Sequence, residues 1–384
     1  MLIYSISSWR IKWKKPIRVL NLFTIMDCGG AETMVMNYYR NINRDLVQFD
    51  FMVHRDKKGE YDDEIKSLGG KIYHMDPIYP NNFSHYKKQL SDFFTEHSEY
   101  KIIHSHMSEL GYFAFKIAKE KGVPVRICHA HNAPNSFDIK MIMRNYFKHK
   151  MLSYDTHLFT CGLNAAKWLY GEKNQNRFIQ LNNAIDTDKF LYNEKVENNI
   201  REKYNLGNKF VVGHVGRFNK QKNHTFLIDV FSEICKIKPN SVLVLVGAGE
   251  LEKDIKNYSI EKNVLDKIVF TGIIKNVNEV VQCFNAFVFP SLFEGLSVTV
   301  VENQAASNLC FISKEIPQEC VISDKVIPIS LKESPKVWAE TVLEHTESYK
   351  KVNMKNQIVE VKFDIKNNAK WLQEFYINEY NEYK

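Results

Sequence analysis

The sequence lacks the cysteine spacings that mark a disulfide framework or a zinc site. Its seven cysteines include no C-x-x-C pair and no repeated spacing; they are Cys28, Cys128, Cys161, Cys235, Cys283, Cys310 and Cys320. Several of them stand in apolar or helical surroundings, where a free thiol behaves as a small hydrophobe. This usage favours a reducing compartment, and we expect a cytoplasmic protein.

Long apolar runs are also missing. No stretch of about 20 apolar residues occurs, so no segment is expected to span a membrane. Residues 1–15 mix apolar and basic side chains and lack the sustained apolar stretch and cleavage site of a secretory signal. There is no low-complexity tract, and no compact basic motif of the kind that binds nucleic acid. At 384 residues the chain is long enough for two domains, because single cores stop growing near ~250–300 residues.

Charge is distributed unevenly along the chain. Residues 1–190 contain 27 Lys+Arg against 20 Asp+Glu, whereas residues 191–384 contain 25 of each. The excess of positive charge in residues 1–190 either forms an ordinary solvated basic surface or attracts an anionic partner, such as a membrane leaflet or a phosphate-bearing acceptor.

Segment 138–150 is the place in this basic half where a membrane-contacting helix is best argued. At helical spacing it forms a basic stripe and an apolar stripe: Lys140, Arg144 and Lys148 make up the first, and Ile139, Ile142, Met143 and Tyr146 the second. A helix facing the core has the same pattern, and so does an interfacial helix with its basic residues at an anionic leaflet.

The first half has the rhythm of a parallel α/β sheet. An apolar strand at 17–23 runs into the glycine loop D-C-G-G-A-E and then a helical stretch, which is how a doubly wound domain begins. Further strands are expected at 49–54, 71–74, 102–105, 125–129, 156–160 and 178–181, with a helix at 111–120.

The pattern restarts after a charged, linker-like segment at 193–204. Strands are expected at 210–217, 241–247, 268–272 and 287–289, and helices at 224–237 and 250–260. The chain therefore predicts an α/β fold of two Rossmann-like doubly wound domains facing a cleft.

Several loops of the second half directly follow strands, at the sheet edge where such domains bind ligands. Arg217 and Lys222 lie five residues apart, and this pair suits a diphosphate. A strand, a loop containing Glu294 and Gly295, and a helix with Glu302 follow later. Helix N-termini favour anions, and carboxylates accept hydrogen bonds from hydroxyls. Together these residues suggest a ligand with both phosphate and hydroxyl groups, such as a nucleotide-activated sugar.

The chain resembles glycosyltransferase family 4, the retaining GT-B enzymes, from about Arg18 to the C-terminus. The resemblance rests on E-x7-E (Glu294 and Glu302, in F-E-G-L-S) and on G-R-x-x-x-x-K-N (216–223). It implies that Glu302 binds ribose, Glu294 the donor sugar, and Arg217 and Lys222 the pyrophosphate. It further implies donor contacts for a set of loop residues and for one histidine: Gly29, Gly30, Gly249, Ile274, Gly295, Leu296, Ser297 and His131.

The resemblance also implies architecture and activity. Residues 1–190 would form the acceptor-side domain, 191–365 the nucleotide-sugar domain, and 366–384 a helix packing back on the first domain. The implied activity is retaining hexosyl transfer from a nucleotide-diphosphate sugar, with a UDP-sugar as the expected donor, to a glycan or lipid-linked acceptor in bacterial surface polysaccharide synthesis. A sugar-nucleotide epimerase and a non-catalytic sugar-nucleotide-binding assembly protein remain alternatives.

Two features bear on metals. D-T-D at 186–188 looks like the metal motif of another glycosyltransferase class, but it resembles the family's interdomain N-G-I-D segment, with Ala184 in place of the usual glycine. His104, His106, His129 and His131 form two H-x-H pairs at strand ends, where both rings of a pair point to one face. No carboxylate or cysteine spacing joins them, so structural histidines are favoured and no metal is expected.

Overall fold

The computed structural model describes residues 15–131 and 140–383, so the N-terminal segment in which no secretory signal is expected lies almost entirely outside this range. The chain divides into two compact units: unit 1 comprises Met1–Leu181 with Asn368–Lys384, and unit 2 comprises Asn182–Asn367. The first division falls before the expected boundary at 190. The reason is local: Asn182 donates to the carbonyl of Lys362 (2.9 Å), and the Ile185 amide donates to that of Phe363 (2.9 Å). These bonds tie residues 182–190 to unit 2.

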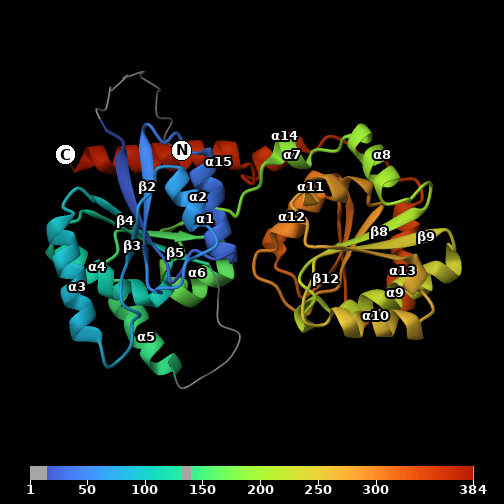
Figure 1. Cartoon of the computed structure of the whole chain (residues 1–384), viewed down its shortest axis with the longest axis horizontal. Coiled ribbons are helices and arrows are strands. Elements are labelled where there is room, and N and C mark those ends of the chain that lie inside the picture. Colours follow the sequence, from blue (N-terminus) through green and yellow to red (C-terminus); the bar gives the residue numbers. More distant parts are fainter. Residues whose placement is uncertain (1–14, 132–139, 384) are drawn as a thin grey trace. The chain divides into compact units, whose positions relative to one another are not determined.

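Unit 1 is built on a seven-stranded sheet in the order β3-β2-β1-β4-β5-β6-β7, and its strand pairs are all parallel (Figure 1). The strands are β1 Ile17–Leu22, β2 Val47–Val53, β3 Ile72–His74, β4 Ile102–Ser105, β5 Val125–Ala130, β6 His157–Thr160 and β7 Phe178–Gln180. The central strands are buried on both faces, as expected of a parallel sheet covered by helices on each side.

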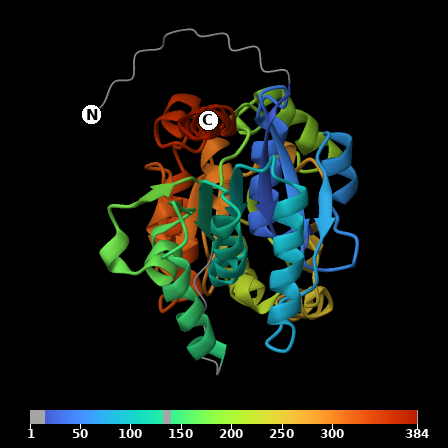
Figure 2. The same ribbon diagram turned by 90° about the vertical axis from the view of Figure 1, so that its left-hand side faces the viewer.

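Helices cover both faces of this sheet (Figures 1 and 2). One face packs against α3 Phe83–Glu96, α4 Gly111–Glu120, α5 Lys140–Met151 and α6 Leu163–Tyr170. The other packs against α1 Gly30–Asn41 and the C-terminal helix α15 Ile365–Glu382; the short helix α2 Asp62–Ser67 precedes β3. Tyr376 of α15 is fully buried, whereas Trp371 is 42% exposed. From Asn368 onward this helix belongs to unit 1.

Unit 2 contains a six-stranded sheet in the order β10-β9-β8-β11-β12-β13, again with every pair parallel. The strands are β8 Phe210–Val215, β9 Ser241–Val246, β10 Ile268–Gly272, β11 Ala286–Phe289, β12 Leu309–Ser313 and β13 Val326–Ile329. One face packs against α9 His224–Ile237, α10 Glu252–Glu261 and α13 Pro335–Thr346, and the other against α7 Thr187–Phe190, α8 Glu194–Lys203, α11 Val277–Val280, α12 Val298–Ala305 and α14 Lys355–Glu360.

The expected linker at 193–204 is wrong, because this segment is helix α8. The Asn193 side chain caps it by accepting from the Lys195 and Val196 amides, and Arg201 pairs with Glu197 one turn away at 2.8 Å. Ile200 is buried in the core of unit 2. The charges belong to the solvated face of a packed helix.

In both sheets the first strand of the unit lies next to the fourth, at the point where the strand order reverses. These switch points lie between β1 and β4 in unit 1 and between β8 and β11 in unit 2. Open α/β sheets bind ligands at the carboxyl ends of the strands that flank this point. A ligand site is therefore expected at these two positions.

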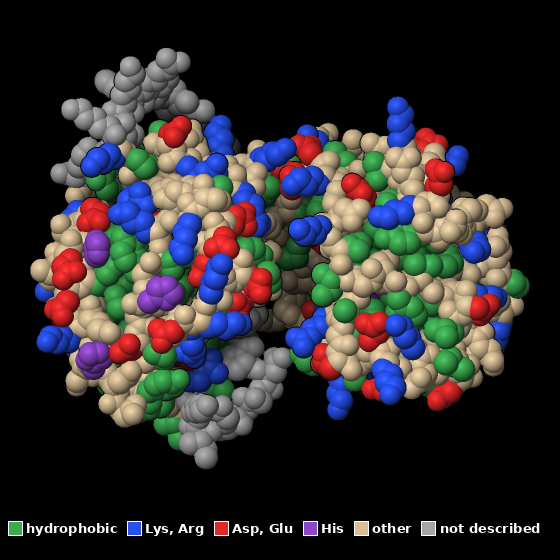
Figure 3. Space-filling model, in the orientation of Figure 1, with side chains coloured by type: hydrophobic (Ala, Val, Ile, Leu, Met, Phe, Trp, Pro, Cys, Tyr) green, Lys and Arg blue, Asp and Glu red, His purple; other side chains and the backbone are tan. Residues whose placement is uncertain are grey.

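The distribution of surface charge and the hydropathy of the helices bear on membrane contact. On the face drawn in Figure 3, basic and acidic side chains of unit 1 are interspersed, so the positive excess is not gathered there into one patch. Among the described residues, no helix combines the length and the apolar character needed to cross a membrane.

Candidate functional site

The switch point of unit 2 contains a buried ion pair. Lys222 ends a 3-10 turn, Lys220–Lys222, that follows β8, and Glu294 stands in the loop after β11. The Lys222 Nζ lies 2.6 Å from Glu294 Oε1, and the two side chains are only 14% and 8% exposed. The same ammonium lies 4.5 Å from the centre of the Phe289 ring. Two charged groups that the sequence places 72 residues apart are thus brought together where the fold favours a ligand.

Local hydrogen bonds fix the turn that presents Lys222. The Asn219 side chain accepts from the Lys222 amide (3.2 Å), and Asn223 adopts the left-handed conformation with φ of 55°. Asn223 donates to the carbonyl of Pro290 (3.2 Å), and the Leu292 amide donates to that of Gln221 (2.8 Å). The two loops are therefore tied to each other, and the N-K-Q-K-N sequence is explained by this turn.

Arg217 also follows β8, but its guanidinium is open to solvent. It contacts Glu250 at 3.2 Å, and the two side chains are 71% and 55% exposed. A contact of this kind contributes little to stability. The guanidinium is available for an anionic ligand.

Gly249 has a structural role that the sequence did not reveal. A Cβ on Gly249 would lie 2.4 Å from the carbonyl oxygen of Phe218, and one on Gly247 would lie 2.1 Å from that of Gly216. The loops after β8 and β9 are in backbone contact, so both glycines are needed for packing. The contact of Gly249 with a ligand stays a prediction.

The loop before α12 differs in one respect from the expectation. Gly295 is exposed and the Leu296 side chain packs on the core, but the Ser297 amide donates to Cys320 Sγ at 3.1 Å. That amide is therefore occupied by protein rather than presented to a ligand. Cys320 lies in a turn after β12, and only the fold brings it under this loop.

Glu302 lies on α12, in its second turn. Burial raises the pKa of its carboxyl to about 8. At neutral pH this group holds a proton for much of the time. A carboxyl in this environment is well suited to pair with hydroxyl groups of a ligand.

The remaining loop residues are placed as follows. Ile274 comes after β10, and its side chain packs against the core of unit 2, whereas the neighbouring Ile273 is 85% exposed. In unit 1, Gly29 is the N-cap of α1 and Gly30 its first residue, without a side-chain cap. A Cβ at Gly30 would meet nothing within 4 Å. A Cβ at Gly29, in contrast, would clash with the Glu32 carboxylate, so this side chain lies against the N-terminus of α1.

Four histidines gather at the switch point of unit 1. His104 and His106 come from the end of β4, and His129 and His131 from the end of β5. His104 Nε2 lies 3.2 Å from His129 Nδ1, and His106 Nδ1 lies 2.8 Å from His131 Nε2. The two hydrogen-bonded pairs stack, with centroids 4.4 Å apart for His104 on His106 and 4.3 Å for His129 on His131.

Burial keeps these imidazoles neutral. It lowers the pKa of His104 to about 3 and that of His131 to about 4, and it holds the pKa values of His106 and His129 well below the usual range. Tyr376 of α15 extends the network, with its hydroxyl 2.7 Å from His104 Nδ1. The H-x-H spacing predicted that the two rings of each motif point to one face; the hydrogen bonds between the strands and the partner from α15 were not predicted.

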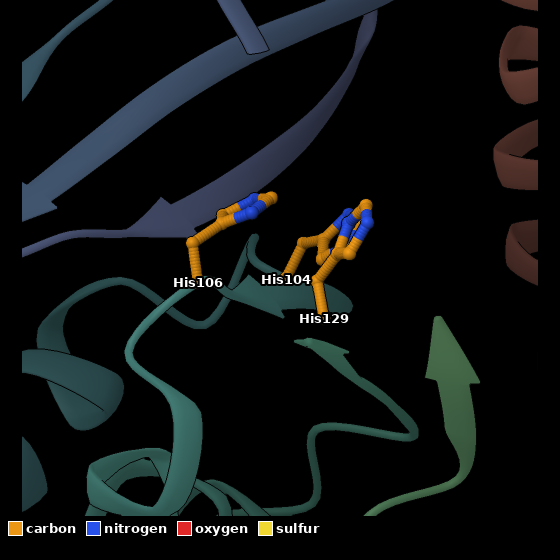
Figure 4. Close-up of side chains that lie close together, drawn as sticks. All are labelled: His104, His106 and His129. Carbon is orange, nitrogen blue, oxygen red and sulfur yellow. The ribbon is translucent and has the colours of Figure 1, made fainter. Parts of the chain in front are cut away.

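The nitrogens of His104, His106 and His129 lie within 4.8 Å of one another, close enough to raise the question of a metal (Figure 4). Both nitrogens of His104, Nδ1 of His106 and Nδ1 of His129 are in the hydrogen bonds described above, whereas His129 Nε2 has no partner among the described residues. A pocket of about 10 Å³ beside them, close to the room needed by one water, supplies space for a partner of His129 Nε2.

The D-T-D segment lies in unit 2 at helix α7. Asp188 pairs with Lys355 and with Lys366, each at 2.6 Å. These ammonium groups lower the pKa of Asp188 to about 2. The segment therefore ties α7 to α14 and to the start of α15, as the structural interpretation expects.

The basic and apolar stripes of helix α5 do not face the directions expected from the sequence. Arg144 binds Glu109 at 2.6 Å and Lys148 donates to the carbonyl of Trp168 at 3.0 Å, so these basic residues face the protein. Ile142 is 77% and Tyr146 56% exposed. The apolar stripe is the outward one, because the long basic side chains reach partners on α6 and near α4. Ile139 and the side chain of Lys140 lie outside the described residues.

Comparison with known proteins agrees with this geometry. The profile of Glycosyl transferases group 1 matches residues 196–358. The chain is 34% identical to the glycosyltransferase EpsF of Bacillus subtilis over 85% of its length and 86% of the relative. It is 27% identical to CapH of Staphylococcus aureus, a capsular polysaccharide biosynthesis glycosyltransferase, over 94% and 99% of the two chains. It is 28% identical to the UDP-Gal:alpha-D-GlcNAc-diphosphoundecaprenol alpha-1,3-galactosyltransferase of Escherichia coli over 59% and 61%.

Among solved structures, Anabaena HepE in complex with UDP superposes with a TM-score of 0.72 at 14% identity, covering 93% of this chain and 94% of that one. The fold is therefore that of the GT-B glycosyltransferases. The chain belongs to the group 1 glycosyl transferases and is a glycosyltransferase.

Proposed function

We propose that this glycosyltransferase moves a sugar, with retention of configuration, from a UDP-sugar to a glycan or lipid-linked acceptor in bacterial surface polysaccharide synthesis. The observation that supports this most is the Lys222–Glu294 pair at the switch point of unit 2, with Glu302 on the following helix. It combines a cation for a diphosphate with two carboxyl groups for hydroxyls. The acceptor class follows relatives whose names specify capsular polysaccharide or a diphosphoundecaprenol-linked sugar.

In this proposal each group has a defined task. The Lys222 ammonium, held between Glu294 and Phe289, and the exposed Arg217 neutralise the charge that develops on the leaving diphosphate. Glu302 accepts from the ribose hydroxyls, and Glu294 from a hydroxyl of the donor sugar. Attack occurs on the face of the sugar that the diphosphate leaves, and a phosphate oxygen takes the acceptor's proton. Such a step needs alignment and charge stabilisation rather than a protein base.

The test is a thermal-shift screen of UDP-, GDP- and ADP-sugars, followed by a nucleoside diphosphate release assay with and without a lipid extract carrying polyprenyl-linked glycans. We expect UDP-sugars to give the largest shift and release of UDP to depend on the extract. Interconversion of the sugar nucleotide without UDP release would indicate an epimerase. Binding without either reaction would indicate a non-catalytic protein.

We predict that transfer needs no divalent metal. Lys222 and Arg217 supply the positive charge that a metal provides in other glycosyltransferases, and Asp188 is held by two lysines. The rate in EDTA should therefore equal the rate with added Mn²⁺ or Mg²⁺. Loss of activity in EDTA, restored by Mn²⁺, would contradict the prediction and return attention to the D-T-D segment.

We further propose that the protein acts in the cytoplasm, where α5 approaches the inner face of the membrane through its outward stripe. Ile142, Met143 and Tyr146 are 77%, 39% and 56% exposed. The Lys150 ammonium lies 5.8 Å from the centre of the Tyr146 ring, at the edge of this stripe. Hydrophobic side chains also surface over this helix in Figure 3. Apolar side chains beside a cation suit an anionic lipid surface.

Co-sedimentation with liposomes measures this contact. We expect the wild type to pellet with phosphatidylglycerol vesicles more than with phosphatidylcholine vesicles, and the Ile142→Ser/Tyr146→Ser variant to pellet several-fold less. Ile237→Ser/Ile260→Ser, which changes two exposed apolar residues of unit 2, is the matched control. Equal pelleting of all three proteins would contradict the proposal.

A further inference from the structure

A pocket of about 380 Å³ lies in unit 2 at the N-terminal ends of α9 and α10. The two helices pack on the same face of the sheet (Figure 1). This volume falls in the range of small-molecule sites, about 300–1,000 Å³. Every residue that lines the pocket belongs to unit 2, and neither Lys222 nor Glu294 is among them. The pocket is therefore distinct from the ion pair at the switch point.

The N-terminus of α9 forms one wall of this pocket. Its N-cap, Asn223, provides no side-chain cap and donates instead to the carbonyl of Pro290 at 3.2 Å. The first helical hydrogen bond runs from the Leu227 amide to the Asn223 carbonyl, so the earlier amides of this turn have no acceptor within the helix. Thr225, on the same turn, has an exposed side chain. This wall thus offers N–H donors and a hydroxyl.

His224 is the residue that points to a ligand. Its side chain lines the pocket and is 2% exposed, and neither ring nitrogen has a hydrogen-bond partner among the described residues. The ring packs against His214 and Phe218, with centroids 4.7 Å apart in each case. Burial lowers the pKa of His224 to about 4, so the ring is neutral, with one N–H and one lone pair. Unpaired buried polar atoms cost free energy, and a hydroxyl can pair with either nitrogen.

Helix α10 supplies an acceptor and an apolar surface. Asp254 is exposed and forms no ion pair within the described part of the chain. The Tyr258 hydroxyl donates to Asp229 at 2.9 Å, and the Lys262 ammonium lies 5.1 Å from the centre of the Tyr258 ring, so this ring is held in place. Leu251 adds an aliphatic side chain beside it. A carboxylate accepts from hydroxyls, and an aromatic ring covers an apolar face.

We propose that this pocket binds a hexose unit of a glycan, at a site distinct from that of the nucleotide sugar. The hydroxyls of a hexose donate to Asp254 and accept from the first-turn amides of α9, while its C–H face packs against Tyr258. A further hydroxyl pairs with His224. A compound with few hydroxyls would leave these polar groups unpaired. The inference goes beyond the proposed function, because it depends neither on the donor nor on transfer.

Saturation-transfer difference NMR of the full chain measures this binding, with the methyl glycosides of glucose, galactose and N-acetylglucosamine as probes. UDP is present in excess, so that the nucleotide-sugar site is filled. We expect at least one glycoside to bind with a Kd on the order of 1–10 mM, as suits a ligand of this size. Asp254→Ala and His224→Phe should each weaken binding about tenfold, the effect of one lost hydrogen bond.

Glu261→Ala, which changes an exposed acidic residue at the other end of α10, is the matched control and should bind like the wild type. His224→Phe keeps an aromatic ring against His214 and Phe218, and circular dichroism reports its folding. If it does not fold, Asp254→Ala decides the question alone, since its side chain is exposed.

Three results would overturn the proposal: no saturation transfer to any glycoside, equal binding by the wild type and the folded variants, or displacement of the glycoside when UDP is added. A wild type that fails to bind UDP would contradict the proposed function instead, and the comparison of the variants would still test the pocket.

Discussion

Replacing Lys222 with alanine should lower kcat for sugar transfer about 10²–10³-fold, because a preorganised charge at the leaving group is worth ~2.7–4 kcal/mol in a dry site. Lys222 is the buried cation at the switch point of unit 2, 2.6 Å from Glu294. Its removal also leaves Glu294 buried without its partner, which disturbs the position of the carboxylate that is to meet the sugar. The measurement is UDP release under saturating donor.

Lys220→Ala is the matched control for this variant. Lys220 begins the same 3-10 turn, but its side chain is exposed. We expect Lys220→Ala to keep near wild-type kcat, and circular dichroism to show that both variants are folded. If Lys220→Ala lost as much activity as Lys222→Ala, or if Lys222→Ala were fully active, the assignment of the diphosphate cation would be wrong.

The second large effect is expected at Glu302. Burial raises the pKa of its carboxyl to about 8, so binding of ribose hydroxyls by the carboxylate releases a proton. UDP affinity of the wild type should therefore rise about tenfold per pH unit between pH 6 and 8 and level off above pH 8. Glu302→Gln should bind ~10–100-fold more weakly above pH 8, from the loss of a charge-assisted hydrogen bond, and should show no such slope.

Calorimetry with UDP across this pH range makes the measurement. Glu333→Gln, which changes an exposed residue of unit 2, is the control and should retain the wild-type slope. A flat profile in the wild type, or the same slope in Glu302→Gln, would exclude Glu302 as the titrating ribose partner.

Periodicity and loop chemistry predicted much of this fold. Continuous apolar runs gave the central strands, and the glycine loop after 17–23 marked the start of a doubly wound domain. β12 and β13 were not predicted. Helix α8 was mistaken for a linker because it is rich in charged residues and its apolar face, which contains Ile200, is narrow. Local pattern is weakest where tertiary packing selects the structure.

The candidate site residues were chosen from motif spacing, but their hydrogen-bond partners could not be predicted from it. Cys320 under Ser297, Tyr376 beside His104 and Asn21 beside His106 are each far from their partner in the sequence. Hydrogen bonds between distant elements are set by the fold, and no local pattern contains them. The expected orientation of the basic residues of α5 was wrong for the same reason. Arg144 and Lys148 point toward Glu109 and the carbonyl of Trp168, which the sequence pattern does not reveal.

A single ¹H NMR time course tests the central claim most directly. It uses the UDP-sugar with the largest thermal shift and the acceptor extract that supports UDP release. The account predicts a new glycosidic signal with the anomeric configuration of the donor, which grows in equal proportion to UDP and is absent with Lys222→Ala. A product of inverted configuration, or a change in the sugar nucleotide without UDP, would contradict it.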